Sequence, residues 1–167
     1  DDPAYGNFVV SKVVEALSQA DRNLQPATLG FGRCLESRIA FNRRFVMRDG
    51  TSCCHPQEPD KILHSEGPID PEVGVVAIRS HAGQLLGMLL NYSCHPVHGY
   101  AEHYVTAGWP GAWVHQLKSK FGSSCVPMVF NGFSGNVHHH NHLDETHDES
   151  YERMGLLLAD DTAGIIE

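Results

Sequence analysis

Apolar and polar positions divide the first part of the chain into one helical and several extended segments. Apolar residues recur at helical spacing across residues 8–20 and form one face, made by Val9, Val10, Val13, Val14 and Leu17. Residues 27–36 and 37–48 read as extended pieces, and Asp49-Gly50 predicts a hairpin-type turn after the second. Residues 51–71 carry four prolines and little apolar periodicity, which predicts a long loop.

The second part of the chain gives the strongest signal for a sheet. Residues 73–80 and 84–93 are apolar runs on either side of a short turn, which predicts an antiparallel hairpin. Residues 109–120 suit a helix, 126–132 a buried strand, and 148–158 a second helix with Asp148 as its N-cap. This order predicts an α/β fold with a mixed β-sheet flanked by helices, and residues 1–167 as a single domain.

Composition narrows the class of protein. The chain is 41% hydrophobic and 19% charged, which is typical of a globular protein, and no apolar run approaches the roughly 20 residues of a membrane span. Its net charge of −8 argues against nucleic acid as a partner, because phosphate backbones are bound by clustered Lys and Arg. We therefore expect no nucleic acid and no transmembrane segment.

Histidine is the one compositional anomaly. Nine of the 12 histidines lie between His95 and His147. One group follows the strand predicted at 84–93, and GNVHHHNH follows the strand predicted at 126–132. Because ligands bind at the carboxyl ends of strands in open α/β sheets, the two groups could converge on one site. Histidine is the commonest metal ligand, so this pattern favours a metal site over a polar turn.

The expected ligands follow from position and spacing. His95 precedes a proline that holds it in an extended conformation. In an extended loop His138 and His140 would point to one side and His139 to the other, so that His95, His138 and His140 nearly complete a zinc site. We expect His98 to be solvated, and the same is expected of His103.

Several sequence blocks then carry a more specific resemblance. GPIDPEVGVVAIR, NYSCHPV, VTAGWPG and VFNGFSGNV occur in the order found in neutral/alkaline non-lysosomal ceramidases, and AFNRRFVMRDG and LGFGRC are also similar to the bacterial members. The resemblance covers most of residues 8–158. It implies part of a larger ceramidase-like catalytic domain, with zinc as cofactor, that cleaves N-acyl linkages of a small-molecule or lipid-like amide. It also implies an exported protein, secreted or periplasmic.

The resemblance assigns some residues and leaves other roles unfilled. His95 matches a zinc-binding histidine of the family, whereas His138 falls where the family has its active-site serine, and Gly108 stands at a position that is often acidic. The family's first zinc-binding histidine lies upstream of the matched region, and its Glu and Tyr ligands lie downstream. We therefore expect the native gene product to be considerably longer, with the rest of the enzyme supplying these ligands.

These expectations combine into one hypothesis with two alternatives. The chain would use zinc to lower the pKa of water to about 7 for attack on an amide carbon, with His138 as a ligand or general base. The first alternative is a metal-binding or scaffold module without catalysis. The second is a metal-independent hydrolase that uses Ser134.

Overall fold

A four-stranded mixed sheet is the centre of the molecule. In the computed structural model, which describes residues 2–99 and 103–166, its strands are β1 (Ala27–Leu35), β6 (Glu72–Ser80), β7 (Leu85–Tyr92) and β8 (Val126–Asn131), in the order β1-β6-β7-β8. β1, β6 and β7 pair antiparallel, and β8 joins β7 in parallel. The predicted hairpin, the strand at 126–132 and the α/β class are thereby confirmed.

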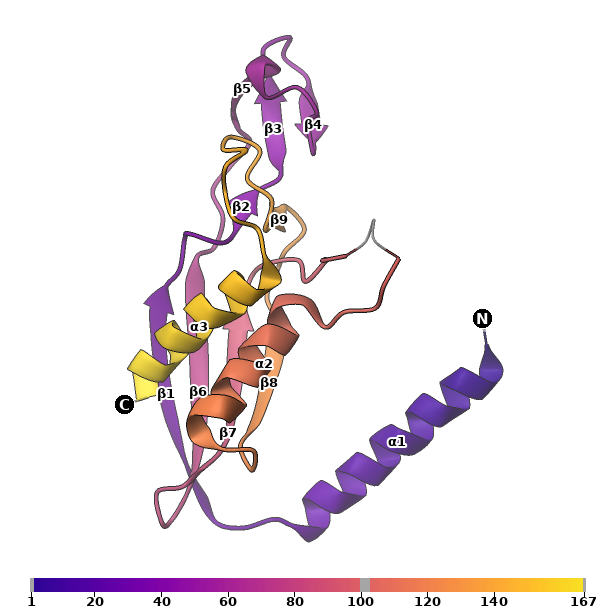
Figure 1. Cartoon of the computed structure of the whole chain (residues 1–167), viewed down its shortest axis with the longest axis vertical. Helices are drawn as coiled ribbons and strands as arrows, with labels where there is room; N and C mark the ends of the chain where they lie inside the picture. Colours follow the sequence, from indigo (N-terminus) through magenta and orange to yellow (C-terminus); the bar gives the residue numbers. More distant parts are fainter. Residues whose placement is uncertain (1, 100–102, 167) are drawn as a thin grey trace.

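Two helices cover one face of this sheet (Figure 1). α2 (Gly108–Phe121) connects the parallel strands β7 and β8, as such a connection requires, and α3 (Tyr151–Ile166) lies against it. The helices approach closely at Gly155, where an added Cβ would lie 2.4 Å from the Cβ of Ala112. Trp109 and Trp113 of α2 are fully buried in this layer. The apolar stripe of each helix and alternate strand residues therefore form a single core.

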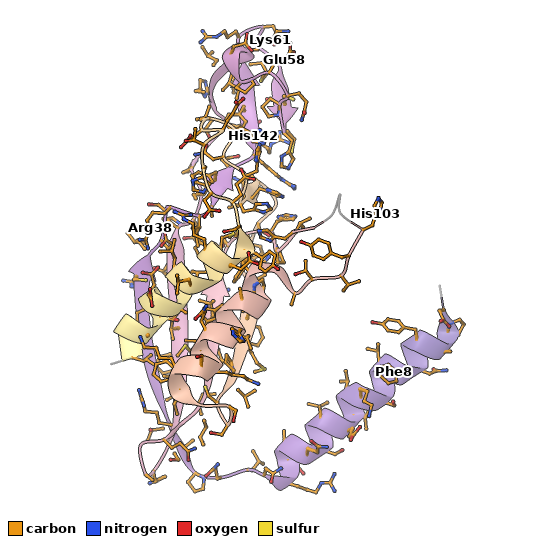
Figure 2. The ribbon with its side chains drawn as sticks, in the orientation of Figure 1. Phe8, Arg38, Glu58, Lys61, His103 and His142 are labelled. Carbon is orange, nitrogen blue, oxygen red and sulfur yellow. The ribbon has the colours of Figure 1, made fainter. Side chains whose placement is uncertain are left out.

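The opposite face of the sheet is largely uncovered. Phe31 of β1 and Met128 of β8 project from this face and are 76% and 47% exposed, and Leu29, Val126 and Phe130 are also exposed. α1 (Pro3–Arg22) has no buried residue at all, and its side chains, Phe8 among them, extend into open space (Figure 2). The predicted helix is confirmed and is longer at both ends. None of the helices in the described part is long and apolar enough to span a bilayer.

A small three-stranded sheet forms a separate lobe at the end of the molecule (Figure 1). β3 (Arg44–Met47) pairs with both β4 (Ser52–Cys54) and β5 (Ile62–Ser65), and a 3₁₀ turn, η1 (Pro59–Lys61), precedes β5. The prediction of a long loop at 51–71 is wrong. The prolines lie between these strands or after them. Ile62 joins Phe45 and Met47 in the small core and Cys53 packs against it, too few positions to mark the strands by periodicity. The turn at Gly50 is confirmed by its φ of 85°.

Two further features place the histidine-rich loop. β2 (Phe41–Asn42) pairs antiparallel with β9 (Val137–His138), which fixes the loop between the main sheet and the small lobe. The helix predicted to begin at Asp148 begins instead at Tyr151. The hydroxyl of Ser150 accepts the N–H of Arg153 at 3.4 Å and caps it, while Asp148 accepts the N–H of Ser150.

A buried carboxylate ties α3 to the end of β1. Glu36 is 1% exposed, and its side chain accepts hydrogen bonds from the guanidinium of Arg38, which also lies 3.6 Å from Asp161 of α3. Burial alone would raise the pKa of Glu36, but hydrogen bonds from Arg38 hold it below its ordinary value. Burial raises the pKa of Asp161 to about 6. This group of charges links α3 to the segment after β1, beside the apolar packing of Met154 and Leu158 in the core.

Candidate functional site

The two histidine-bearing segments meet beyond the carboxyl ends of β7 and β8. The N–H of Gly132 donates to the carbonyl of Tyr92 at 3.0 Å, which keeps the two chains side by side after the strands end. The backbone N–H of His95 then points to the carbonyl of Val137 in β9. The rings of His95 and His138 lie with centroids 6.3 Å apart. Backbone pairing thus brings together residues that are 43 positions apart in the sequence.

The ring of His95 is oriented by the backbone. Its Nδ1 lies 3.2 Å from the carbonyl oxygen of Val137. Because a carbonyl oxygen only accepts, Nδ1 carries the proton and the lone pair of the neutral ring is on Nε2. Metal-binding histidines are usually held in this way, through a hydrogen bond from the other ring nitrogen.

His138 has the opposite arrangement. Its Nδ1 accepts the backbone N–H of His140 at 3.2 Å, which places the proton of the neutral ring on Nε2. Burial, together with the charges of His55 and Arg43, lowers its pKa to about 3. In this conformation the ring is therefore a neutral N–H donor at Nε2, and it would serve as a ligand or a base there only after giving up that proton.

A carboxylate orients His140. Its Nδ1 makes a short hydrogen bond to Glu149, which also accepts the N–H of Asn141 at 3.2 Å. The lone pair of the neutral ring is then on Nε2, and a carboxylate in this position fixes the orientation of a metal-binding imidazole. The ring meets that of His142 edge to face, with centroids 4.3 Å apart.

Two histidines that lie in this site, His55 and His142, were not predicted from the sequence as site residues. His55 Nδ1 lies 3.0 Å from His142 Nε2, and the ring of His55 is 4.9 Å from that of His138. His55 follows β4 in the small lobe and has a φ of 56°, a strained value for a residue with a side chain. Arg43 connects the same lobe to the loop by donating to the carbonyl of Gly135 at 2.8 Å. No local pattern could have paired residues 87 positions apart.

Two expectations about the histidines are wrong. His139 does not point away from His138, because their ring centroids are 4.2 Å apart, and it is only 9% exposed. His98 is not solvated, because it stacks on His139 with centroids 3.9 Å apart. The chain turns directly after β9, so the alternation of an extended strand does not apply. His103 is exposed, as expected.

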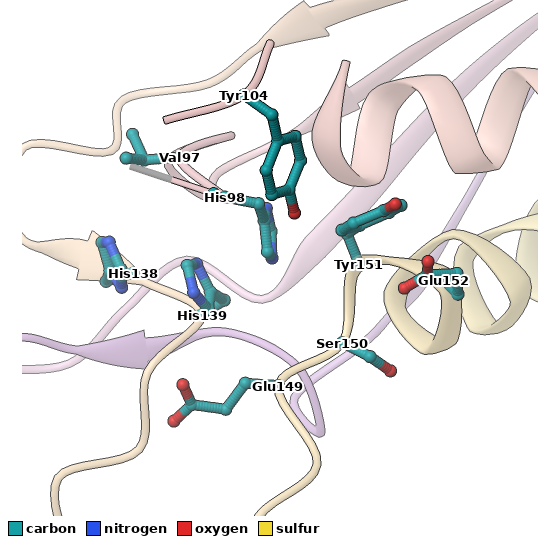
Figure 3. A pocket seen from close by; sticks show the side chains of 10 residues that line it. Val97, His98, Tyr104, His138, His139, Glu149, Ser150, Tyr151 and Glu152 are labelled. Atoms are coloured by element: carbon teal, nitrogen blue, oxygen red, sulfur yellow. The ribbon is translucent and has the colours of Figure 1, made fainter. Parts of the chain in front are cut away.

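A cavity of about 560 Å³ opens beside these rings (Figure 3). His138 and His139 line one side, and His98 lies between them and Tyr151 at the start of α3. The acidic position that the family resemblance assigns to Gly108 is close to this wall. Gly108 has a φ of 54°, and a Cβ there would lie 3.2 Å from His98 Nδ1. A larger residue would therefore need both a strained backbone and a shift of His98.

The chain offers metal ligands without a complete centre. Among residues 2–99 and 103–166, no three His, Cys, Asp or Glu side chains are grouped so that they could hold a metal ion. The imidazoles of His95 and His140 nevertheless present the kind of donor that zinc prefers, each with its other nitrogen engaged. The described residues therefore hold two imidazole donors of the kind that zinc prefers, but no group that could bind the ion by itself.

Ser134 lacks the partners of a catalytic serine. Its hydroxyl hydrogen-bonds to the side-chain amide of Asn131 at 2.9 Å. In the described part of the chain no histidine is hydrogen-bonded to it. A nucleophilic serine needs such a base within reach, so this arrangement gives no support to the metal-independent alternative.

Acid should destabilise the metal-free fold through its buried histidines. Burial lowers the pKa of His139 to about 3 and that of His142 to about 4, whereas both titrate near 6.5 when unfolded. Between these values only the unfolded state gains protons, so stability falls as pH drops below about 6.5. We expect a loss of roughly 1–2 kcal/mol per group between pH 7 and pH 5. Urea unfolding at pH 7 and at pH 5 measures this difference in the free energy of unfolding.

The His139→Gln variant should show a smaller difference between the two pH values than the wild type. Equal stability of the wild type at pH 7 and pH 5 would contradict the prediction.

Comparison with known proteins places this geometry in a known fold. No family model matches the chain, and no curated protein does. Among solved structures, the neutral ceramidase from Pseudomonas aeruginosa matches with a TM-score of 0.70 at 20% identity, and a ceramidase complexed with C2 matches with 0.72 at 19%. Each match covers 95% of this chain and 25% of the ceramidase chain. The chain therefore has the fold of about a quarter of a neutral ceramidase.

Proposed function

We propose that this chain is part of a zinc-dependent hydrolase of N-acyl amide linkages. The observation that carries the proposal is the ring of His95, which the Val137 carbonyl holds beyond the end of β7. Its Nε2 has no hydrogen bond within residues 2–99 and 103–166, and the His138 ring is 6.3 Å away. The ceramidase-like fold supports the reaction class. The substrate would be a small-molecule or lipid-like amide.

His95 and His140 would have one role in this reaction and His138 another. His95 and His140 would bind zinc through Nε2, and zinc, when bound, would supply Lewis acidity toward the acyl carbonyl. His138 would act on the reacting groups through Nε2, first as a hydrogen-bond donor to the developing negative charge. It would become a third ligand or a general base only if the His140 N–H released its Nδ1, so that the ring proton could move to that nitrogen.

Further ligands would come from polypeptide that these 167 residues do not contain. The chain spans a quarter of the length of the ceramidases it matches, and two apolar surfaces lack a cover: one face of the main sheet and the apolar side of α1. Covering such surfaces is the usual role of another layer of the same domain. An exported location, secreted or periplasmic, belongs to this proposal and rests on the sequence resemblance alone.

A second candidate is a metal-binding or scaffold module without catalysis. The observation that favours it is the hydrogen bond from the His140 N–H to Nδ1 of His138, which leaves that nitrogen engaged. The sequence resemblance assigns His138 to the position of the family's active-site serine, so the usual nucleophile would be absent. This candidate requires zinc binding with no turnover.

An assay of N-acyl amide hydrolysis distinguishes the zinc-dependent hydrolase from the metal-binding module and from the metal-independent hydrolase. The zinc-loaded protein should release the free amine from a fluorogenic N-acyl amide, lose this activity on chelation and regain it when zinc is restored. Stoichiometric zinc without amine release would favour the binding module. Amine release that persists after chelation would exclude a role for zinc in catalysis and would favour the hydrolase that uses Ser134. A sample with His115→Ala, an exposed histidine on α2, serves as a control for nonspecific metal uptake.

A further inference from the structure

β1 is the outermost strand of the main sheet, and in the described part of the chain no strand pairs with its outer edge (Figure 1). It pairs with β6 on one side only. Just after β1, the N–H of Glu36 donates to the carbonyl of Pro71 at 2.9 Å, so even-numbered positions direct their backbone groups toward β6. Because this direction alternates along a strand, the odd-numbered residues of β1 direct their N–H and C=O groups outward. These residues are Ala27, Leu29, Phe31, Arg33 and Leu35.

The two edges of the main sheet differ in how far they oppose further pairing. β8, at the other edge, is six residues long and contains Pro127, which has no N–H to donate. Prolines and charged residues are the usual devices that keep an edge strand unpaired. β1 is nine residues long and contains no proline, and Arg33 is its only charged residue. The outer edge of β1 is therefore the one that favours pairing with another strand.

We propose that β1 pairs antiparallel with β1 of a second copy of this chain, about a two-fold axis at Phe31. Phe31 would then lie opposite the partner's Phe31, an aromatic pair of the kind that stabilises antiparallel strands. Arg33 would lie opposite the partner's Leu29, so no like charges would meet. An axis at Arg33 would instead place two arginines opposite each other, and an axis at Leu29 would leave the second half of β1 unpaired.

The pairing would join the two main sheets into one continuous sheet. Residues directly opposite each other in an antiparallel pair lie on the same face, so the uncovered faces of both copies would be continuous. The two strands would run in opposite directions, which places the two histidine clusters at opposite ends of the dimer. The inference is therefore independent of the proposed function.

Sedimentation of the chain at increasing protein concentration tests the proposal. We expect a reversible shift from monomer to dimer. Pairing of one edge strand buries less surface than a standard protein interface, so the dimer should be weak and should depend on concentration. A monomer at every concentration would overturn the inference.

Two substitutions at one position test the register. Leu29→Glu would place a carboxylate opposite the partner's Arg33, whereas Leu29→Lys would place a like charge there. Because two-fold symmetry makes each contact twice, the Kd of the dimer should be about 10-fold higher for Leu29→Lys than for Leu29→Glu. The chain has a net charge of −8, so a general charge effect would have the opposite sign. Equal Kd values, or the reverse order, would overturn the inference.

A second pair of variants distinguishes the edge of the sheet from its uncovered face. Phe31 and Phe130 are 76% and 55% exposed on that face, in the two edge strands β1 and β8. Phe31→Lys would place two like charges opposite each other and should raise the Kd about 10-fold or more. Phe130→Lys should leave the Kd unchanged. Equal weakening by both variants would indicate that the dimer forms by stacking of the uncovered faces, which would contradict pairing through β1.

Discussion

Replacing His95 with alanine is expected to weaken zinc binding by about 100-fold or more. His95 has its Nδ1 proton committed to the Val137 carbonyl, so Nε2 is a preoriented donor at no further cost. Loss of a residue that merely orients a ligand already lowers metal affinity 10- to 100-fold in metal sites, and loss of a ligand should exceed this. Competition with a chromophoric chelator measures the affinity.

The control for this experiment is another histidine of the same chain. His115 is exposed on α2 and is not part of the histidine cluster, so His115→Ala should leave zinc affinity unchanged. Glu149→Gln, which weakens the support of His140, should have an intermediate effect. If His95→Ala binds zinc as tightly as His115→Ala does, His95 is not a ligand.

Replacing Trp113 with alanine should have the largest effect on stability. Trp113 of α2 is fully buried in the main core, and its Nε1 donates to the hydroxyl of Thr162 in α3 at 3.1 Å. Truncating a buried tryptophan leaves a cavity and typically costs roughly 3–5 kcal/mol. That is a large share of the stability of an ordinary domain, so the variant should be largely unfolded at moderate urea concentrations. Urea unfolding followed by circular dichroism measures the difference.

The Trp113→Phe variant distinguishes the contribution of packing to stability from that of the hydrogen bond to Thr162. The phenylalanine ring keeps part of the packing, and Thr162 retains the bond from its hydroxyl to the Leu158 carbonyl. We expect a smaller loss, roughly 1–2 kcal/mol. A loss below about 1 kcal/mol for Trp113→Ala would contradict the central position of this residue in the core.

The main sheet could be predicted because its strands leave long patterns in the sequence. β6 and β7 bury alternate residues against α2 and α3, and the short turn between them leaves one simple way to pair them. The small lobe left no such pattern. Its strands are three or four residues long, and its core contains only Phe45, Met47 and Ile62, with Cys53 against them. Periodicity needs more positions than these strands possess.

The candidate site, too, could be predicted from the sequence only in part. The placement of His95 and the His138 loop at neighbouring strand ends follows from strand order, which sequence patterns indicate. The direction of each ring does not follow. It depends on the turn after β9 and on single backbone hydrogen bonds, such as the one from His140 to His138. The approach of His55 to His142 depends on how the small lobe folds over the loop.

The most direct test of zinc binding by His95 and His140 is X-ray absorption at the zinc edge of the zinc-loaded protein. We expect at least two imidazole ligands with Zn–N distances of about 2.0–2.1 Å, and one imidazole fewer in His95→Ala. A spectrum with only oxygen ligands, or one identical in the wild type and His95→Ala, would contradict the account.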